Sequence, residues 1–345
     1  MLYAMPKIQT VLGPIDPKKL SVTLAHEHLQ IDVRSLWTLP AESMLRKYAN
    51  QPVQMSNLGV LRRNPAVSKD NLILNDVDLA VKEALVFKKS GGRSIVDQTS
   101  VGIGRNAESL RVISKRTGLN IIAGSGYYVG NTHPKTLKKR GSEEIAKEII
   151  HDINHGIDNT SVKSGIIGEI GIGPKMSSRE EKILRAAGIA HKETACPISV
   201  HLTPPARQGH KVLDVLFQEG VKFERVALDH LDSQLDLEYD VSLIERGCYI
   251  CYDEFGEQYD DLDGISFPRD IDRIEYLVKL RDKGMLEKVL ISQDVGVKMD
   301  LKRYGGTGYD HILTNILPMM KKRGLTEKDI TTLTVENPMN FLTFK

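Results

Sequence analysis

Short runs of apolar residues recur along the chain, and each is followed by a longer stretch in which apolar and polar positions alternate with helical spacing. The runs are nearly continuous and rich in β-branched residues, which is typical of strands buried on both faces of a parallel sheet. We predict eight strands, at residues 21–29, 93–99, 120–128, 164–173, 197–203, 225–232, 248–256 and 288–296.

The stretches between these strands carry the start and stop signals of helices. The segment at 78–92 ends in glycine, and the segment at 178–194 begins with serine followed by acidic residues. Eight strand–helix units without a change of composition predict an α/β fold, a (β/α)8 TIM barrel that forms one domain over residues 1–345. Residues 326–342 are predicted to add an extra C-terminal helix. A doubly wound sheet is the alternative, but the glycines at 124–130 match its phosphate-binding turn poorly.

Residues 34–73 separate the first predicted strand from its helix, so they interrupt the regular alternation of strands and helices. A loop of this length in a compact domain is usually functional or disordered. The segment contains Trp37, the only tryptophan, and several other apolar residues. We therefore predict that this insertion lies near the active-site mouth as a cover, with ordinary surface packing as the alternative.

The charge balance and the cysteine content limit the partners and locations to be expected. The 47 basic residues are nearly matched by 45 acidic residues, which gives a net charge of +2. Nucleic-acid-binding proteins usually have a clear basic excess, so we expect no nucleic-acid partner. No apolar run approaches the ~18 residues of a membrane span, and three cysteines are too few for a disulfide framework. These features predict a cytoplasmic protein with no membrane association, in which Cys248 and Cys251 are buried thiols on opposite faces of a strand.

Histidine and carboxylate side chains fall at the C-terminal ends of five predicted strands. In a barrel of this kind, catalytic groups collect at that end. The first strand carries two histidines that flank a single residue, and they share a face because side chains alternate along a strand. The full set is His26, His28, Glu169, His201, His230 and Asp294.

These residue types are the ligands that zinc, manganese, cobalt or iron accept in proteins. Six protein ligands exceed the three of a single catalytic zinc, so two divalent ions that share a carboxylate and a water molecule explain the set better. Such a pair turns the shared water into a nucleophile, and the predicted chemistry is hydrolysis. Separate structural roles are the alternative, with Asp294 as a helix cap, Glu169 as an ion-pair partner and each histidine as a hydrogen-bonded core residue. Six such roles at one end of one barrel are a poor explanation.

The six residues lie in the motifs TLAHEHL, GIIGEIG, VHL, LDHLD and LISQD, and further motifs are VLGPI near the start and YGGTGYDHILTNILP and ENPMNFL near the end. Together these motifs resemble the phosphotriesterase family of the amidohydrolase superfamily, particularly its branch of phosphotriesterase-related proteins. The resemblance implies that His26, His28 and Asp294 bind the more buried ion, and that His201 and His230 bind the more exposed one. It also implies that Asp294 accepts a proton from the bridging hydroxide as it attacks, and that the protein is a homodimer.

One position departs from the pattern of the best-known family members. They bridge the two ions with a carboxylated lysine on the fourth strand, and this chain has Glu169 at the matching place. A glutamate supplies the bridging carboxylate without carbon dioxide, so the resemblance still implies a two-ion centre. The difference puts organophosphate triester hydrolysis in doubt as the native activity.

The ligand set does not identify the substrate, because a two-ion centre can hydrolyse lactones, esters, amides and phosphoesters. We predict that Tyr128 contacts the substrate oxygen, with a packed rim aromatic as the alternative. The loops after the fifth and eighth predicted strands contain the basic residues Arg207, Lys298, Lys302 and Arg303. We predict that one or more of them bind an anionic group of the substrate, and the alternative is that they are solvated surface residues.

The function predicted from the sequence is metal-dependent hydrolysis of a small ester or lactone, and an anionic group on this small-molecule substrate is a further hypothesis. Within the same family, N-acyl amide hydrolysis is the nearest alternative and phosphotriester hydrolysis the next. From a different class, the alternative is a non-catalytic barrel that binds a metabolite.

Overall fold

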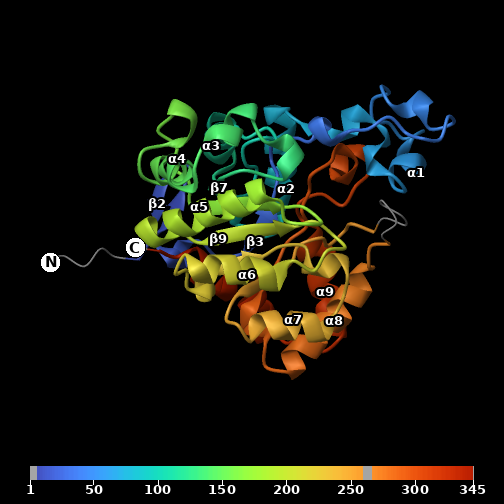
Figure 1. Cartoon of the computed structure of the whole chain (residues 1–345). Coiled ribbons are helices and arrows are strands. Elements are labelled where there is room, and N and C mark those ends of the chain that lie inside the picture. The colour runs from blue at the N-terminus through green and yellow to red at the C-terminus, as the bar shows by residue number, and fades with distance from the viewer. Residues whose placement is uncertain (1–5, 259–265, 345) are drawn as a thin grey trace.

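Eight parallel strands form the central sheet of the computed structural model, which describes residues 6–258 and 266–344 (Figure 1). The strands are hydrogen-bonded to one another in chain order, as in a (β/α)8 barrel. They are β3 (Thr23–Glu27), β6 (Ser94–Asp97), β7 (Asn120–Ser125), β8 (Ile166–Ile172), β9 (Ile198–Leu202), β10 (Val226–Leu228), β11 (Tyr249–Tyr252) and β12 (Val289–Ile291). The predicted fold class is confirmed, and each predicted strand is present but ends earlier than its apolar run.

A helix follows each strand. These helices are α2 (Val77–Lys89), α3 (Ala107–Thr117), α4 (Ser142–Asn154), α5 (Ser178–Thr194), α6 (Gly209–Gln218), α7 (Leu237–Ile244), α8 (Asp270–Asp282) and α9 (Leu317–Lys322), the last preceded by a π-helical turn at Ile312–Ile316. The predicted C-terminal extension is also present, as α10 (Glu327–Thr331) and α11 (Asn337–Leu342) joined by a second π-helical turn. Asn337 donates hydrogen bonds to the carbonyls of Leu286 and Val289 at 2.8 and 2.6 Å, which ties the extension to the start of β12.

Capping residues of the predicted kinds are present, but α5 is capped by Ser177 instead of Ser178, and α2 has its C-terminal cap at Ser90, before the predicted glycine. The Ser177 hydroxyl accepts a hydrogen bond from the Glu180 amide, and the Glu180 carboxylate accepts one from the Ser177 amide, so α5 begins with a capping box. Helix α3 ends at Gly118, whose φ of +68° is a conformation that glycine adopts without strain. Local side chains therefore set where these helices start and stop.

The strands bury both of their faces. One buried cluster takes a residue from each of several strands, among them Ala25, Val96, Ile122, Ala227, Cys251 and Leu290, and only the inside of the barrel brings these side chains together. Alternate strand residues such as Leu24 and Ile95 belong to a larger cluster with the helices. Cys248 lies in this outer cluster and Cys251 in the inner one, which confirms the prediction of two buried thiols on opposite faces.

The two ends of the described chain meet at the N-terminal end of the barrel (Figure 1). A hairpin of β1 (Ile8–Thr10) and β2 (Gly13–Ile15) lies near the start of the described residues, and Lys7 exchanges backbone hydrogen bonds with Phe344. Ile8 and Phe341 join the inner cluster, so residues from both ends plug this side of the barrel. Within the described residues, no helix is both long enough and apolar enough to span a membrane.

The insertion leaves the barrel and returns to it through a two-stranded ribbon. Strand β4 (Ile31–Asp32) pairs antiparallel with β5 (Ile73–Leu74), and the short helix α1 (Leu58–Leu61) lies between them with several 3-10 turns. This pairing joins positions about forty residues apart, so the local apolar pattern of the sequence did not reveal it.

The insertion packs on the loop that follows β12. Val53, Leu61 and Val67 form a small apolar cluster with Met299 of that loop. The Lys298 ammonium lies 2.6 Å from the carboxylate of Asp70, which fastens the same loop to the insertion. The insertion therefore belongs to the side of the barrel where the strands end, and its role as a cover of the mouth stays a prediction.

Candidate metal centre

The six predicted residues come together at the C-terminal ends of the strands. The Glu169 carboxylate lies at the middle of the group, 3.1 to 3.8 Å from a ring nitrogen of each of the four histidines. On the other side, Asp294 Oδ1 lies 3.1 Å from His28 Nε2 and 3.6 Å from His26 Nε2. The convergence expected from the strand-end positions is therefore present.

The polar atoms at this centre are buried and lack ordinary partners. His26 Nε2, Glu169 Oε2 and Asp294 Oδ1 make no hydrogen bond, although buried polar atoms in proteins are normally paired. Ligand atoms of His26, His28 and Glu169 lie within 4.8 Å of one another, and so do those of Glu169, His201 and His230. Two triads that share one carboxylate fit a centre of two bound cations bridged by Glu169.

Irregular backbone places these side chains. The pairing of β3 with β6 shifts register between Leu24 and Glu27, and such bulges re-aim the side chains around them. Gly168 precedes the central carboxylate with a φ of +153°, and a Cβ there would lie 2.7 Å from the Ser199 carbonyl oxygen. His230 and Asp294 follow their strands in the left-handed region, at φ of +62° and +49°. The predicted strands over 225–232 and 288–296 were thus too long, because the chain leaves the sheet to aim these two residues.

Asp253 orients two of the candidate ligands, and it was not among the residues predicted from the sequence. Its Oδ2 lies 3.1 Å from His26 Nδ1, and its Oδ1 lies 3.2 Å from His230 Nδ1. The backbone amide of His230 also donates to this carboxylate at 2.9 Å. A carboxylate on the far nitrogen of an imidazole fixes the ring and turns its other nitrogen to the metal. Asp253 directly follows β11, so the strand-end rule could have identified it.

A hydrogen-bond chain sets the tautomer of His28. The Thr99 hydroxyl donates to the Gln30 carbonyl at 2.8 Å, so its oxygen must accept from His28 Nδ1, which lies 2.8 Å away. With its proton on Nδ1, the ring leaves the lone pair of Nε2 facing Glu169 and Asp294. This is the form in which an imidazole binds a metal ion.

Charges at the centre balance one another when no ion is bound. Burial opposes ionisation of Glu169, but the close imidazole rings of His201 and His230, followed by the charge of His26, outweigh it and hold the carboxyl pKa well below its usual range. Burial likewise lowers the pKa of His26, yet the nearby carboxylates Asp294 and Asp229 outweigh it and raise that pKa well above the ordinary value. The pKa of His230 is also raised, chiefly by Asp253 against the effect of burial. Protonated imidazoles thus neutralise the carboxylates that a metal ion would otherwise neutralise.

Metal ions and protons are therefore expected to compete for His26 and His230. Protonation of these rings stabilises the metal-free fold below pH 6.5, and that contribution is lost as the pH rises through their raised pKa values. The metal-free protein should lose thermal stability toward alkaline pH, while its zinc affinity rises about tenfold per pH unit for each proton displaced. Zinc titration against a chromophoric chelator and thermal unfolding, each over a pH series, measure the two effects.

The histidine variant His151→Gln is a suitable control for this pH series, because His151 lies on α4 and is exposed. It should reproduce the wild-type dependence of zinc affinity on pH. A zinc affinity that stays constant from pH 6.5 to about 8.5 would contradict the raised pKa values, since no proton would then be displaced.

Of the residues predicted to contact substrate, Tyr128 lies at the centre itself. Its hydroxyl is 3.3 and 3.4 Å from the two ring nitrogens of His201. Burial, followed by the charge of Glu169, raises its pKa well above the ordinary value, so the hydroxyl keeps its proton. A Cβ on Gly171 would lie 2.2 Å from the Tyr128 carbonyl carbon, so this glycine lets the tyrosine backbone approach β8.

The four predicted bases have other contacts in this structure. Lys298 pairs with Asp70, Lys302 lies 2.7 Å from the carboxylate of Asp310, and Arg207 pairs with Asp236. The side chain of Arg303 is exposed, and its amide donates to Glu83 at 2.9 Å. Sequence spacing does not reveal these acids, because each pair joins separate segments of the chain or opposite ends of a loop. The predicted roles of the four bases in substrate binding stay predictions.

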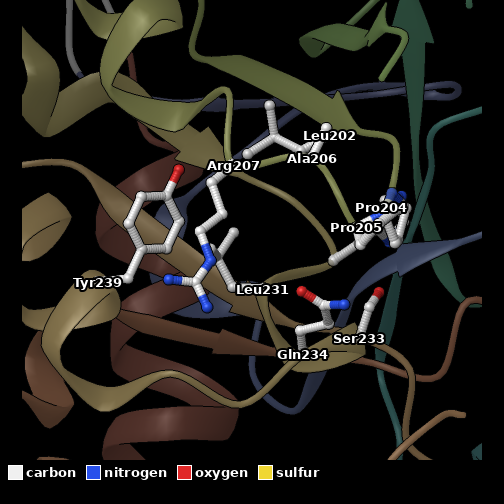
Figure 2. A pocket seen from close by; sticks show the side chains of 10 residues that line it. Leu202, Pro204, Pro205, Ala206, Arg207, Leu231, Ser233, Gln234 and Tyr239 are labelled. Carbon is white, nitrogen blue, oxygen red and sulfur yellow. The ribbon is translucent and has the colours of Figure 1, made fainter. Parts of the chain in front are cut away.

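A pocket opens beside the centre and includes Arg207 in its wall (Figure 2). The guanidinium carbon of Arg207 lies 5.4 Å from the centre of the Tyr239 ring, and Pro204 and Pro205 line another part of the wall. The remaining lining residues are Leu202, Ala206, His230, Leu231, Ser233 and Gln234. His230 connects the pocket to the candidate ligands, and Arg207 is the only permanently charged residue of the lining.

The chain is similar to known proteins over nearly its whole length. The model of the phosphotriesterase family matches residues 6–342. N-acetyltaurine hydrolase from Homo sapiens is 36% identical over 344 residues, which cover 98% of both chains. The crystal structure of a resiniferatoxin-binding protein from Rhodobacter sphaeroides has a TM-score of 0.95 and 39% identity, covering 97% of this chain and 94% of that one. The structure of a phosphotriesterase homology protein from Escherichia coli, with phosphate in its active site, has a TM-score of 0.81 and 31% identity, covering 95% and 100%.

Proposed function

Because the chain belongs to the phosphotriesterase family and is a metal-dependent hydrolase, we propose that it cleaves the amide bond of a small N-acylated amine that carries an anionic group. The observation that carries the proposal is the 36% identity to N-acetyltaurine hydrolase over 98% of both chains. N-acetyltaurine is an amide whose amine part ends in a sulfonate. This relative favours the amide alternative over the ester or lactone predicted from the sequence.

The proposal includes two divalent ions, with zinc as the first choice, because the candidate ligands are imidazoles and carboxylates. The two groups of residues that would hold them are His26, His28, Glu169 and Asp294, and Glu169, His201 and His230. Two ions bound there would polarise the amide carbonyl and make a water molecule a stronger nucleophile at neutral pH.

Asp294 is proposed to move the proton of the reaction. Its side chain is 20% exposed, whereas those of the other candidate ligands are 10% exposed or less, so it faces the open side of the centre. There it would accept a proton from the attacking water and return it to the leaving nitrogen. Amide cleavage requires this return, because an unprotonated amine anion is a very poor leaving group.

Tyr128 and Arg207 are proposed to bind the two ends of the substrate. The protonated Tyr128 hydroxyl would donate a hydrogen bond to the carbonyl oxygen. Arg207 would bind the sulfonate or carboxylate in the pocket beside His230, in exchange for Asp236. The Arg207 side chain is 53% exposed, and exposed ion pairs contribute only about 0–1 kcal/mol, so this exchange costs little.

A pair of matched amides tests the proposal. The zinc-loaded protein is expected to hydrolyse N-acetyltaurine with a higher kcat/KM than N-propylacetamide, which lacks the sulfonate. The variant Arg207→Gln should lose about 10- to 100-fold in kcat/KM for N-acetyltaurine, the usual effect of losing a charged hydrogen bond, and should leave the neutral amide unchanged. Initial rates from amine release with both substrates measure this difference.

Arg246→Gln is the matched control, because Arg246 pairs with Asp214 of the helix that follows Arg207 but does not line the pocket. Equal efficiency with both amides would remove the anionic group from the proposal. Hydrolysis of ester analogues without any amide hydrolysis would favour an esterase over an amide hydrolase. Binding of these compounds without turnover, in protein that holds about two ions per chain, would support the non-catalytic barrel.

A further inference from the structure

Glu27 lies between His26 of β3 and His28, which directly follows that strand, and it is not among the candidate metal ligands. Glu27 is completely buried, and its carboxylate reaches the residues that follow β12. Its Oε1 accepts hydrogen bonds from the Ser292 hydroxyl at 2.7 Å and from the Gln293 amide at 3.0 Å. Its Oε2 accepts one from the Val295 amide at 3.0 Å. Both carboxylate oxygens therefore accept hydrogen bonds from residues that follow the last strand of the barrel.

This seam is where the first and last strands of the barrel meet. Strands β3 and β12 stand at the two ends of the hydrogen-bonded strand order, and in the described residues no ladder pairing joins them. Three successive amides after β12 instead point to β3. The amides of Gln293 and Val295 reach the Glu27 side chain, and the amide between them, that of Asp294, reaches the His26 carbonyl at 3.3 Å. A side chain thus satisfies backbone donors that a sheet ladder would otherwise satisfy.

The two amides held by Glu27 are those on either side of Asp294. Asp294 has a φ of +49°, an unfavourable conformation for a residue with a Cβ that needs support from its surroundings. Glu27 itself lies between His26 and His28, whose Nε2 atoms are 3.6 and 3.1 Å from Asp294 Oδ1. One carboxylate therefore connects the backbone of the histidine pair to the backbone of the aspartate.

We propose that Glu27 is a positioning residue that sets the distance between the His26–His28 pair and Asp294, and so builds the part of the centre that these three side chains share. Without its two backbone contacts, Asp294 could relax from the left-handed conformation and turn its carboxylate from the histidines. The inference depends on the proposed function only for its rate measurement, because the geometry of the centre can be followed without substrate.

The variant Glu27→Gln tests this proposal. Glutamine has the same size but a single acceptor oxygen, and its NH₂ group would face one of the two amides, so at least one amide loses its partner. Zinc affinity is expected to fall about 10- to 100-fold, as is usual when a residue that orients metal ligands is changed. The kcat should fall by a similar factor while KM stays within about threefold, since Glu27 makes no contact with the pocket. Amide hydrogen exchange at Gln293, Asp294 and Val295, followed by NMR, should become faster.

Ser292→Ala is the matched control, because it removes one donor to the same carboxylate and leaves both flanking amides in place. It should keep zinc affinity and kcat within about threefold of wild type. Glu27→Asp keeps both acceptor oxygens of the carboxyl group but is one methylene shorter, so it should show intermediate losses, and it replaces Glu27→Gln in every measurement if that variant does not fold.

A folded Glu27 variant with faster exchange at these amides but unchanged zinc affinity and kcat would overturn the proposal and leave Glu27 as a closure of the barrel only. Lower zinc affinity with unchanged exchange at these amides would overturn it as well. If the wild-type protein hydrolyses no amide, the proposed function fails, but the zinc affinity and the exchange rates still decide the role of Glu27.

Discussion

Replacing Asp294 by asparagine is expected to lower kcat about a thousandfold without unfolding the protein. Asparagine has the same shape, but its amide cannot accept a proton from the attacking water, and proton transfer by a positioned side chain typically contributes 10²–10⁴ in rate. The change also removes a negative charge that lies 3.1 Å from His28 Nε2 and 3.6 Å from His26 Nε2. Asp294→Asn therefore affects both the proton path and the binding of the ion beside these histidines.

Two measurements separate these effects. Metal content by mass spectrometry after loading with excess zinc shows how many ions remain, and kcat at saturating substrate then reports the proton path in fully loaded protein. Asp214→Asn is a suitable control, because Asp214 is exposed and pairs with Arg246 away from the centre. A loaded Asp294→Asn protein with kcat within tenfold of wild type would show that another group accepts the proton.

The position of the candidate centre could be predicted from the sequence because strand ends are a local property. His26, His201 and Asp294 each follow or end an apolar run, and in a barrel all runs end at the same rim. The expected convergence of these side chains is present, and His26 and His28 face the same two carboxylates, as the alternation along a strand predicts. The predicted strand ends were wrong, because His230 and Asp294 lie beyond their strands in left-handed conformations.

The contacts that orient the centre could not be predicted, because each joins residues far apart in the chain. Asp253 reaches His26 and Glu27 reaches Val295 only after the barrel closes. The same limit applies to the bases expected to face the substrate. Lys298 looks free in its own loop, and its partner Asp70 lies 228 positions earlier. Apolar periodicity records which face of an element is buried, but it carries no information about which charges meet.

We expect the largest loss in the free energy of unfolding when the Arg273 side chain is replaced. Its side chain is completely buried at the start of α8, where its Nε lies 2.7 Å from Asp232 and its Nη2 lies 3.6 Å from Glu254. Its Nη1 donates to the carbonyls of Glu257 and Pro268 at 3.0 and 2.6 Å. One guanidinium thus donates hydrogen bonds to the Asp232 carboxylate and to two carbonyls, and its charge lies near the Glu254 carboxyl group. Asp232 in turn accepts the amide of Asp253 at 3.0 Å, so this cluster supports the residue that orients His26 and His230.

The variant Arg273→Met keeps most of the side-chain volume but leaves these carboxylates buried without a counter-charge. Removing one partner of a buried ion pair typically costs 3–5 kcal/mol, so we expect a loss of about that size in the free energy of unfolding by urea. Arg269→Met is the matched control, because Arg269 caps the same helix and pairs with Asp272 but is 70% exposed, and its loss should cost less than about 1 kcal/mol.

The pH dependence of the stability loss in Arg273→Met shows whether the unpaired charge causes it. Burial already raises the pKa of Asp232 to about 6 against the charge of Arg273, and without that charge the pKa should rise further. A carboxyl group whose pKa is higher in the folded than in the unfolded state lowers the free energy of unfolding when the pH is high enough to ionise it. This loss is smaller at a pH low enough to keep the group protonated in the folded state. The deficit of Arg273→Met should therefore be smaller at pH 5 than at pH 8. Equal deficits at both values would mean that lost packing, and not the unpaired charge, weakens the variant.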